Sequence, residues 1–268
     1  MPASSPIIEV RSAEGESWER WLHEIRRAEL DLTLDHVPLG RHATTLELGS
    51  GDGYQLGLLR QRFQRVFAID PDHLPARPSG FAYAMAEALP FRDGAFDLVV
   101  SNCVVEHLAD RRGALEETLR VLRPGGYVAH VVPAPFWKAA SLMLNPIGYP
   151  MRVAEKWLAI RRTRRHPQGG ASTNRRPAPR PGFRQVLGGW FYPPIHGTYP
   201  SHRAELRSYA HERWEEVFTH PHLVRVAEVP LLSYTQFGFL RFRLNSLRRA
   251  LGRHGLESSR AFILRKVA

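Results

Sequence analysis

One segment, residues 46–53, constrains the fold of this chain more than any other. Its sequence, LELGSGDG, ends a short apolar run and is followed by a helical stretch, YQLGLLRQRF. Three glycines in a turn between a strand and a helix permit positive φ and let a ligand approach the backbone closely. The N-terminus of the following helix offers unpaired N–H groups to a carboxylate or phosphate. The segment therefore predicts a ligand-binding turn in an α/β fold.

Short apolar runs and helical patterns alternate on both sides of this turn. After VFAID and FAYAM, the apolar run AFDLVVSN lies between Gly94 and Asn102, as is typical of a strand buried on both faces. A helix over about 111–122 and a strand over YVAHVVP follow. This alternation predicts parallel βαβ units. Apolar positions at helical spacing between residues 17 and 37 predict an additional helix that packs on the domain.

The second half of the chain has a different pattern. Residues 136–160 are apolar but interrupted by Pro146 and Pro150, and an arginine-rich stretch with many prolines and glycines follows. A single helix over RAELRSYAHERWEEVFTH and two further strands with a helix between them complete the α/β pattern. We therefore expect an N-terminal helical segment (1–40), a ligand-binding core (41–133), an insertion or lid (134–200) and the C-terminal part of the same domain (201–268).

Composition and charge exclude several classes of protein. The chain has 268 residues, a formal net charge of +11 and one cysteine, Cys103, which excludes a disulfide framework and a multi-cysteine metal site. A single cysteine also favours a reducing, cytoplasmic location. No apolar run reaches the roughly 18 residues of an ordinary transmembrane helix. Eight arginines and no acid fall in residues 161–184, in a composition typical of a mobile loop, which disfavours a nucleic-acid-binding face.

The spacing of the glycines and of Asp70 indicates which type of ligand the turn binds. Tyr54 stands where the dinucleotide fingerprint G-x-G-x-x-G needs its third glycine, and the absence of Gly-Lys-Ser/Thr excludes a P-loop. Asp70 closes the next predicted strand, 21 residues after Gly49, where an acid can bind both ribose hydroxyls of a nucleoside. An ordinary tight turn for the glycines and a helix cap for Asp70 are the alternatives.

In four ordered segments the chain resembles the class I S-adenosylmethionine-dependent methyltransferases, in particular the type 11 group that includes the ubiquinone and menaquinone methyltransferases. The segments are LELGSGDG, VFAIDPD, AEALPFRDGAFDLVVSNCVVEHL and LRPGGYVAHVV, and they cover roughly residues 44–133. The resemblance implies an α/β fold: a Rossmann-like methyltransferase sheet with flanking helices, an N-terminal helix and a long insertion before the last helix–strand units. It also implies S-adenosyl-L-methionine as the cofactor.

The resemblance assigns cofactor-binding roles to residues at the ends of the predicted strands. These are Glu47, Gly49, Ser50 and Gly51 for the methionine end, Asp70 for the ribose, Ala86 and Glu87 beside the adenine, and the backbone carbonyls of Ser101 and Asn102 for the amino group. One position departs from the family pattern, because Met85 stands where an aspartate usually precedes the glutamate of the adenine motif. Adenine recognition is then expected to depend on backbone groups, Glu87 and packing against Met85.

Methyl transfer to a hydroxyl needs alignment of the reactants and, where a proton must leave, a general base. His107 and His196 are the candidate catalytic residues, since the family places the first near the methyl group and the second lies in the turn-rich PPIHGTYPSH. Related small-RNA 2′-O-methyltransferases bind a metal through Glu-x-x-Glu-His, but Cys103 replaces the first glutamate here. We predict no metal; ligation by Glu106 and His107, or structural roles for both, are the alternatives.

The chemical class of the methyl acceptor is predicted from residues 136–160, where aromatic and aliphatic side chains precede the arginine cluster. Such a segment suits a membrane interface, although packing against the core or in a dimer also accounts for it. We therefore expect an O-directed methyltransferase acting on a small-molecule or lipid/glycan acceptor, with peripheral contact at the inner membrane face. The alternatives are an RNA or protein methyltransferase that uses the arginine-rich loop, and a non-catalytic cofactor-binding protein.

Overall fold

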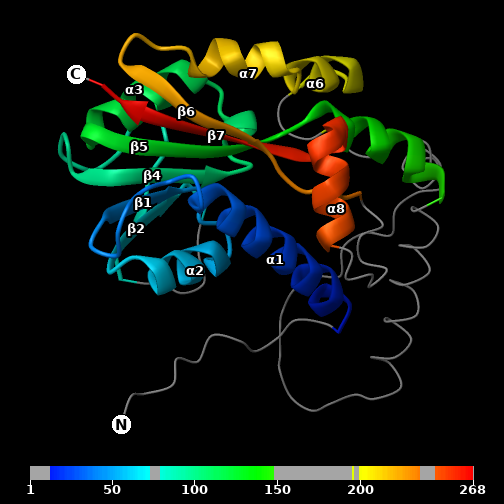
Figure 1. Ribbon diagram of the computed structural model, residues 1–268, viewed down its shortest axis with the longest axis horizontal. Helices are drawn as coiled ribbons and strands as arrows, with labels where there is room; N and C mark the ends of the chain where they lie inside the picture. The colour runs from blue at the N-terminus through cyan, green and yellow to red at the C-terminus, as the bar shows by residue number, and fades with distance from the viewer. Residues whose placement is uncertain (1–12, 73–78, 148–194, 196–198, 236–244, 268) are drawn as a thin grey trace, which may run out of the picture.

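The computed structural model describes residues 13–72, 79–147, 195, 199–235 and 245–267. Within these residues the chain forms one seven-stranded sheet with helices on both faces (Figure 1). The strands are β1 (Thr44–Leu48), β2 (Arg65–Asp70), β3 (Phe81–Tyr83), β4 (Phe96–Asn102), β5 (Leu122–Pro133), β6 (Leu223–Pro230) and β7 (Ser259–Lys266). The helices are α1 (Ala13–Leu34), α2 (Tyr54–Arg62), α3 (Arg111–Val121), α6 (His202–Ser208), α7 (His211–Phe218) and α8 (Asn245–Leu251), with short turns η1 (Val105–His107) and η2 (Gly252–Leu256).

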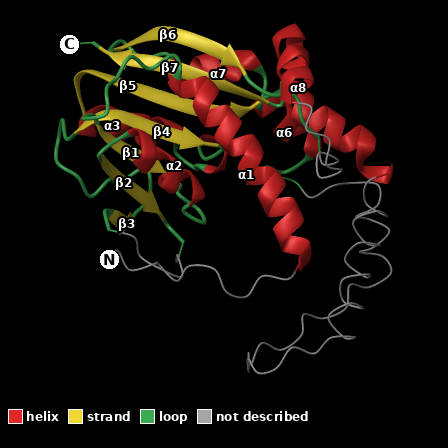
Figure 2. Cartoon of the chain, turned by 60° about the horizontal axis from the view of Figure 1, so that its bottom comes forward, coloured by secondary structure: helices red, strands yellow, loops and turns green. Residues whose placement is uncertain are grey.

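The strand order β3-β2-β1-β4-β5-β7-β6 confirms the predicted fold class. Strands β1 to β5 run parallel, and β7 lies antiparallel between β5 and β6 (Figure 2). The order reverses between β1 and β4, so the turns that follow these two strands lie side by side at the carboxyl edge. Open α/β sheets bind their ligands in the crevice at such a switch point.

Each face of the sheet has its own apolar layer. On one face, Ala114 of α3 and Trp214 of α7 pack in the same core cluster. On the other face, Leu30 of α1 and Leu59 of α2 pack against the strands. Both layers meet at β4, whose central residues are almost completely buried, which confirms the prediction of a strand covered on both faces.

Two predicted elements differ from the structure. The prediction of a single helix before β6 is wrong, because the structure has two separate helices, α6 and α7. The helix is interrupted where the backbone of Ala210 is extended and the side chain of Tyr209 enters the core. The strand predicted from Tyr127 begins earlier, at Leu122, with an irregularity in its pairing to β4 between Phe96 and Leu98.

The predicted insertion lies mostly outside the described residues. Its first part is helical from residue 135 to 147 and continues directly from the end of β5. In the part of the chain that the structure describes, no helix combines the length and apolar character needed to cross a bilayer.

Candidate functional site

The glycine turn after β1 has the backbone geometry that the sequence predicts. Gly49, Gly51 and Gly53 all have left-handed φ values, of 70°, 53° and 80°. A Cβ at Gly49 would lie 2.4 Å from Cγ2 of Val104, whereas a Cβ at Gly51 or Gly53 would meet no atom within 4 Å. The turn is therefore pressed against the segment after β4 at one end and leaves open space beside its other glycines.

Asp70 lies at the end of β2 and holds this turn. Its Oδ2 accepts a hydrogen bond from the Gly51 N–H at 2.8 Å, and its Oδ1 accepts one from the Asp72 N–H at 2.9 Å. A carboxylate offers about four lone-pair sites, so each oxygen can accept a second hydrogen bond. Asp70 can thus fix the turn and accept ribose hydroxyls at the same time.

Buried oxygens without a partner lie beside the turn. Glu47 is 1% exposed, and burial raises the pKa of its carboxyl to about 8, against the opposing effect of a hydrogen bond with Gln55. Glu47 Oε2 and Ser50 Oγ have no hydrogen-bond partner among the described residues. Buried polar groups in folded proteins are nearly always satisfied, so these two atoms indicate a place for polar groups of a ligand.

The predicted adenine segment follows β3 and adjoins Asp70, whose carbonyl accepts a hydrogen bond from the Ala84 N–H. Ala86 is buried, and Oε2 of Glu87 is buried without a partner among the residues described. The side chain of Met85 is largely exposed. These three residues therefore form an apolar and acceptor-bearing segment close to the proposed ribose site.

The end of β4 lies next to the glycine turn, as the parallel pairing of Leu48 with Ser101 requires. The hydroxyl of Ser101 lies 2.7 Å from Nδ1 of His130. Burial lowers the pKa of His130 to about 4, so its imidazole is neutral at physiological pH. The Ser101 hydroxyl is therefore already engaged by His130, and the predicted role of the Ser101 backbone carbonyl stays a prediction.

Helix α1 contributes two site residues that the sequence analysis missed. Nη1 of Arg26 donates to Oδ1 of Asn102 at 2.5 Å and to Sγ of Cys103 at 3.1 Å. The same nitrogen lies 3.0 Å from Oε2 of Glu29. Glu29 is 0% exposed, and its other oxygen, Oε1, accepts a hydrogen bond from the Ser259 hydroxyl. The sequence feature that could have indicated these residues is Glu29 itself. This charged residue lies one helical turn after Ile25, in the apolar stripe of the predicted helix.

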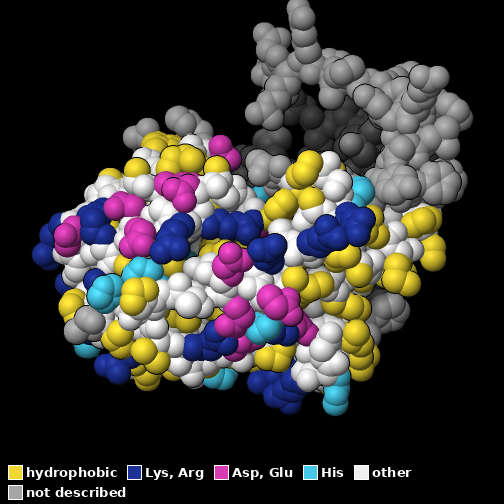
Figure 3. All heavy atoms as spheres, turned by 90° about the horizontal axis from the view of Figure 1, so that it is seen from above, with side chains coloured by type: hydrophobic (Ala, Val, Ile, Leu, Met, Phe, Trp, Pro, Cys, Tyr) yellow, Lys and Arg dark blue, Asp and Glu magenta, His cyan; other side chains and the backbone are white. Residues whose placement is uncertain are grey.

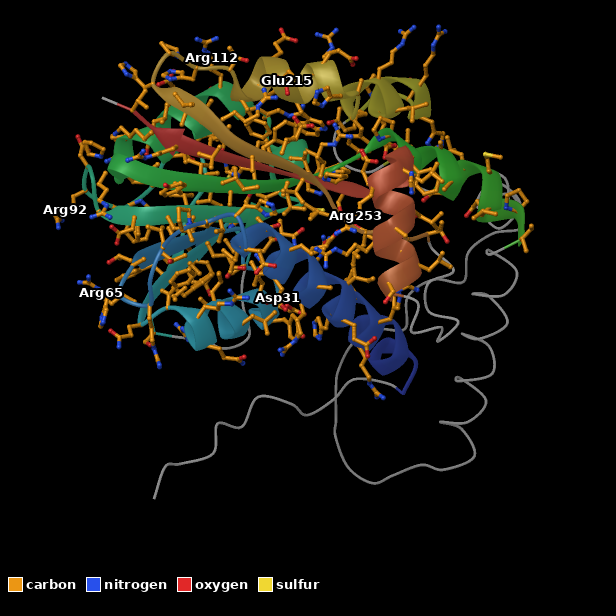
Figure 4. All side chains as sticks on the ribbon, viewed as in Figure 1. Asp31, Arg65, Arg92, Arg112, Glu215 and Arg253 are labelled. Carbon is orange, nitrogen blue, oxygen red and sulfur yellow. The ribbon has the colours of Figure 1, made fainter. Side chains whose placement is uncertain are left out.

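The same helix covers the outer side of the glycine turn. Nε2 of His23 lies 2.9 Å from Oδ2 of Asp52, and the His23 ring stacks on the Tyr54 ring with centroids 3.7 Å apart. Nε of Arg27 donates to the Tyr54 hydroxyl at 3.4 Å. Figure 4 shows α1, marked by Asp31, lying beside α2 on this side of the molecule. These contacts place α1 as one wall of the site.

The segment after β4 carries the predicted base. His107 has a side chain 43% exposed, with Nε2 3.9 Å from Oε1 of Glu106. Glu106 is 3% exposed, and burial raises the pKa of its carboxyl to about 7. Desolvation raises the pKa of the Cys103 thiol to about 12, so the thiol is protonated at neutral pH. His107 is therefore accessible, whereas Glu106 is enclosed and Cys103 is half-buried.

The second predicted base, His196, lies outside the described residues. Tyr199, three residues later, donates from its hydroxyl to the Glu106 carbonyl at 3.3 Å and accepts a hydrogen bond from Arg111. The chain before α6 thus reaches the segment after β4. His202 instead faces Glu205, with 3.8 Å between Nδ1 and Oε2.

One group of three potential metal ligands occurs within the described ranges. His211, Glu215 and Glu228 have ligand atoms that all lie within 4.8 Å of one another. Arg225 pairs with both carboxylates, and Arg260 pairs with Glu228, so the negative charge is compensated without a metal ion. Glu106 and His107, the alternative metal ligands, are not part of this group.

Comparison with known sequences identifies the region that contains this site. A family described as a methyltransferase domain matches residues 46–130. A probable S-adenosylmethionine-dependent methyltransferase of Mycolicibacterium smegmatis is 34% identical over 156 residues, which are 54% of this chain and 59% of that protein. A malonyl-[acyl-carrier protein] O-methyltransferase of a Marinomonas species is 27% identical over 39% of this chain and 43% of that protein. The chain matches less than two thirds of the length of these curated relatives.

Comparison with solved structures extends the similarity of fold to nearly the whole chain. A chain from the complex of the Haloferax volcanii Trm112 activator with a methyltransferase has a TM-score of 0.53 and 16% identity, covering 97% of this chain and all of that one. A geranyl diphosphate methyltransferase solved with geranyl diphosphate and sinefungin has a TM-score of 0.50 and 15% identity, covering 92% and 80%. At these identities the similarity concerns the fold alone.

Proposed function

We propose that this chain, whose residues 46–130 match a methyltransferase domain, is an S-adenosylmethionine-dependent methyltransferase of the type 11 group and transfers the methyl group to an oxygen of a small-molecule, lipid or glycan acceptor. One observation supports the proposed site above all others. At the switch point of the sheet, an open glycine turn lies beside Asp70 and beside buried, unpartnered oxygens of Glu47 and Ser50. This donor and acceptor set fits the ribose and the amino-acid end of the cofactor.

When bound, S-adenosylmethionine supplies an electrophilic methyl group on a sulfonium that leaves as a neutral thioether. The chain must hold it, orient the acceptor and exclude water, and alignment of the reactants can contribute about 7–11 kcal/mol. Asp70 would bind the ribose hydroxyls, and Glu47 would face the cationic methionine end. Helix α1, anchored by Arg26 and His23, would shield this end from water.

His107 is the proposed general base, because an acceptor hydroxyl must lose its proton as the methyl group arrives. Its imidazole is exposed, and it directly follows the segment that packs on the glycine turn. The enclosed Glu106 lies beside it and would stabilise the imidazolium formed on proton transfer. His196 remains a second proposed base.

A peripheral contact with the inner membrane face is proposed for residues 136–160. The described part of this segment supports it: Met143 and Ile147 are 78% and 62% exposed and lie four residues apart on one helix. Residues at this spacing share a helix face. An exposed apolar stripe beside an arginine-rich stretch suits an interface between water and lipid.

Calorimetry with S-adenosylhomocysteine, followed by transfer of labelled methyl groups to cell extract, tests the proposal. We expect binding by the unmodified chain, at least tenfold weaker binding by Asp70→Ala, and normal binding but slower labelling by His107→Ala. Binding without any labelled product would favour a non-catalytic cofactor-binding protein. A labelled product that nuclease or protease destroys would instead favour the RNA or protein methyltransferase.

A further inference from the structure

A recess of about 470 Å³ lies between α3 and the α6–α7 pair, outside the cofactor site. Arginines from three helices line it: Arg111 and Arg112 from α3, Arg207 from α6 and Arg213 from α7. The rest of the wall contains small and apolar residues such as Leu115, together with Glu216 and with His220, whose Nε2 lies 3.3 Å from Oε1 of Glu116. The volume falls within the range of small-molecule pockets, roughly 300–1,000 Å³.

The positive charge of this recess is only partly compensated. Glu216 is the one carboxylate in its lining, and it is already paired with Arg213 at 2.8 Å. Arg111 is held over the Trp214 ring, 4.9 Å from its centroid. In the described part of the chain, the side chains of Arg112 and Arg207 have neither a hydrogen bond nor an ion pair. Two exposed guanidinium groups from different helices therefore line the recess without a partner among the described residues.

The position of the recess connects it with the methyl acceptor. Helix α3 starts four residues after His107, and Arg111 donates to the Glu106 carbonyl at 3.2 Å. The recess thus begins at the carboxyl edge of the sheet, where transfer is proposed. A second arginine-lined hollow contains Arg41 and Arg65 but lies at the opposite, amino edge of β1 and β2. Proximity to the reacting edge distinguishes the first hollow from general surface charge.

We propose that the recess binds a phosphate or diphosphate group of the methyl acceptor, an inference that rests on the proposed function. Guanidinium groups bind phosphate oxygens through paired, charge-assisted hydrogen bonds, and two of them can hold one diphosphate. Seen from above, basic side chains are spread over the face of the molecule that carries α6 and α7, with acidic side chains among them (Figure 3). The recessed shape fits a discrete phosphate-bearing molecule.

Calorimetry with inorganic pyrophosphate tests the site without knowledge of the acceptor. We expect saturable binding at one site, with a dissociation constant at least tenfold higher in Arg112→Gln and in Arg207→Gln. Arg92→Gln is the matched control, because this exposed arginine lies away from Arg112, at the end of the sheet near Arg65 (Figure 4). Arg65→Gln controls for the second hollow, and neither control should alter the affinity.

Two further measurements separate this inference from the proposed function. All four variants should bind S-adenosylhomocysteine normally, and phosphatase treatment of the extract should reduce methyl labelling. If the cofactor binds normally but pyrophosphate does not bind, the phosphate site alone is overturned. The same holds if Arg65→Gln and Arg112→Gln weaken pyrophosphate binding equally. Loss of cofactor binding by the unmodified chain overturns the proposed function. Binding to phosphatidylglycerol vesicles without pyrophosphate binding would assign the arginines to a lipid surface and overturn the phosphate site.

Discussion

Replacement of Gly49 by alanine strains the site in two ways that can be separated. The residue has φ of +70°, and a left-handed conformation costs a residue with a Cβ about 1–2 kcal/mol. The new methyl group would also lie 2.4 Å from Cγ2 of Val104, and overpacking of this kind costs about 1–3 kcal/mol. We therefore expect Gly49→Ala to lower the free energy of unfolding by about 2–5 kcal/mol.

The chain offers matched controls for each contribution. Gly51 has φ of +53° but open space around the position of a Cβ atom. Gly51→Ala should therefore lower the free energy of unfolding only by the cost of the left-handed conformation, about 1–2 kcal/mol. Gly57 lies inside α2 with no atom within 4 Å, and Gly57→Ala should stabilise the chain by up to about 1 kcal/mol.

Urea unfolding at constant pH measures these differences, and calorimetry with S-adenosylhomocysteine measures their effect on the site. Gly49→Ala should also weaken cofactor binding, because relief of the overlap moves the turn that is proposed to hold the methionine end. Val104→Ala in the Gly49→Ala background should restore the part of the free energy of unfolding that is lost through the overlap with Val104. Equal stability of Gly49→Ala and Gly51→Ala, or no recovery in the double variant, would refute the contact between the turn and the segment after β4.

Three further substitutions test the walls of the site. Asp70→Asn should raise the dissociation constant of the cofactor about tenfold or more in calorimetry, because each charge-assisted hydrogen bond contributes roughly 1.5–3 kcal/mol. Arg26→Leu should lower the free energy of unfolding by about 3–5 kcal/mol, since it leaves Glu29 buried without its cation, and Arg26→Leu combined with Glu29→Leu should recover most of the loss. Burial raises the pKa of Glu47 to about 8 from 4.5, so the folded chain binds more protons than the unfolded chain between these values. Stability should therefore fall as pH rises from about 5 to 8, and Glu47→Gln should flatten this dependence in urea unfolding across that range.

The core of the fold could be predicted from sequence because its signals are local. The glycine turn, the doubly buried β4 and the alternation of strands with helices each appear within a few neighbouring residues. The break between α6 and α7 could not be predicted in this way, because the amphipathic pattern continues through Tyr209. Only the packing of its ring against Trp214 and other core residues decides that the helix ends there.

The missed site residues depend on contacts between distant parts of the chain. Arg26 and Asn102 are 76 positions apart, and nothing in the local sequence of α1 indicates which strand end its guanidinium reaches. The same holds for the recess, where Arg112 and Arg207 come from helices on either side of the insertion. Sequence patterns identify the elements, whereas the packing of α1 and α6 on the sheet determines which charged side chains meet.

The distribution of charge around the carboxyl edge suits a reaction between a cation and an anion-bearing partner. Glu47 is buried beside the glycine turn, where the positive charge of a bound sulfonium and ammonium would favour its ionised form. Arg112 and Arg207 line the recess that is proposed to bind the acceptor, where they would favour a phosphate. The cofactor site would then repel an anionic acceptor, and the arginine-lined recess would repel the cationic cofactor, so each molecule would be kept out of the site of the other. In the proposed reaction, these opposite charges would orient the cofactor and the acceptor relative to each other.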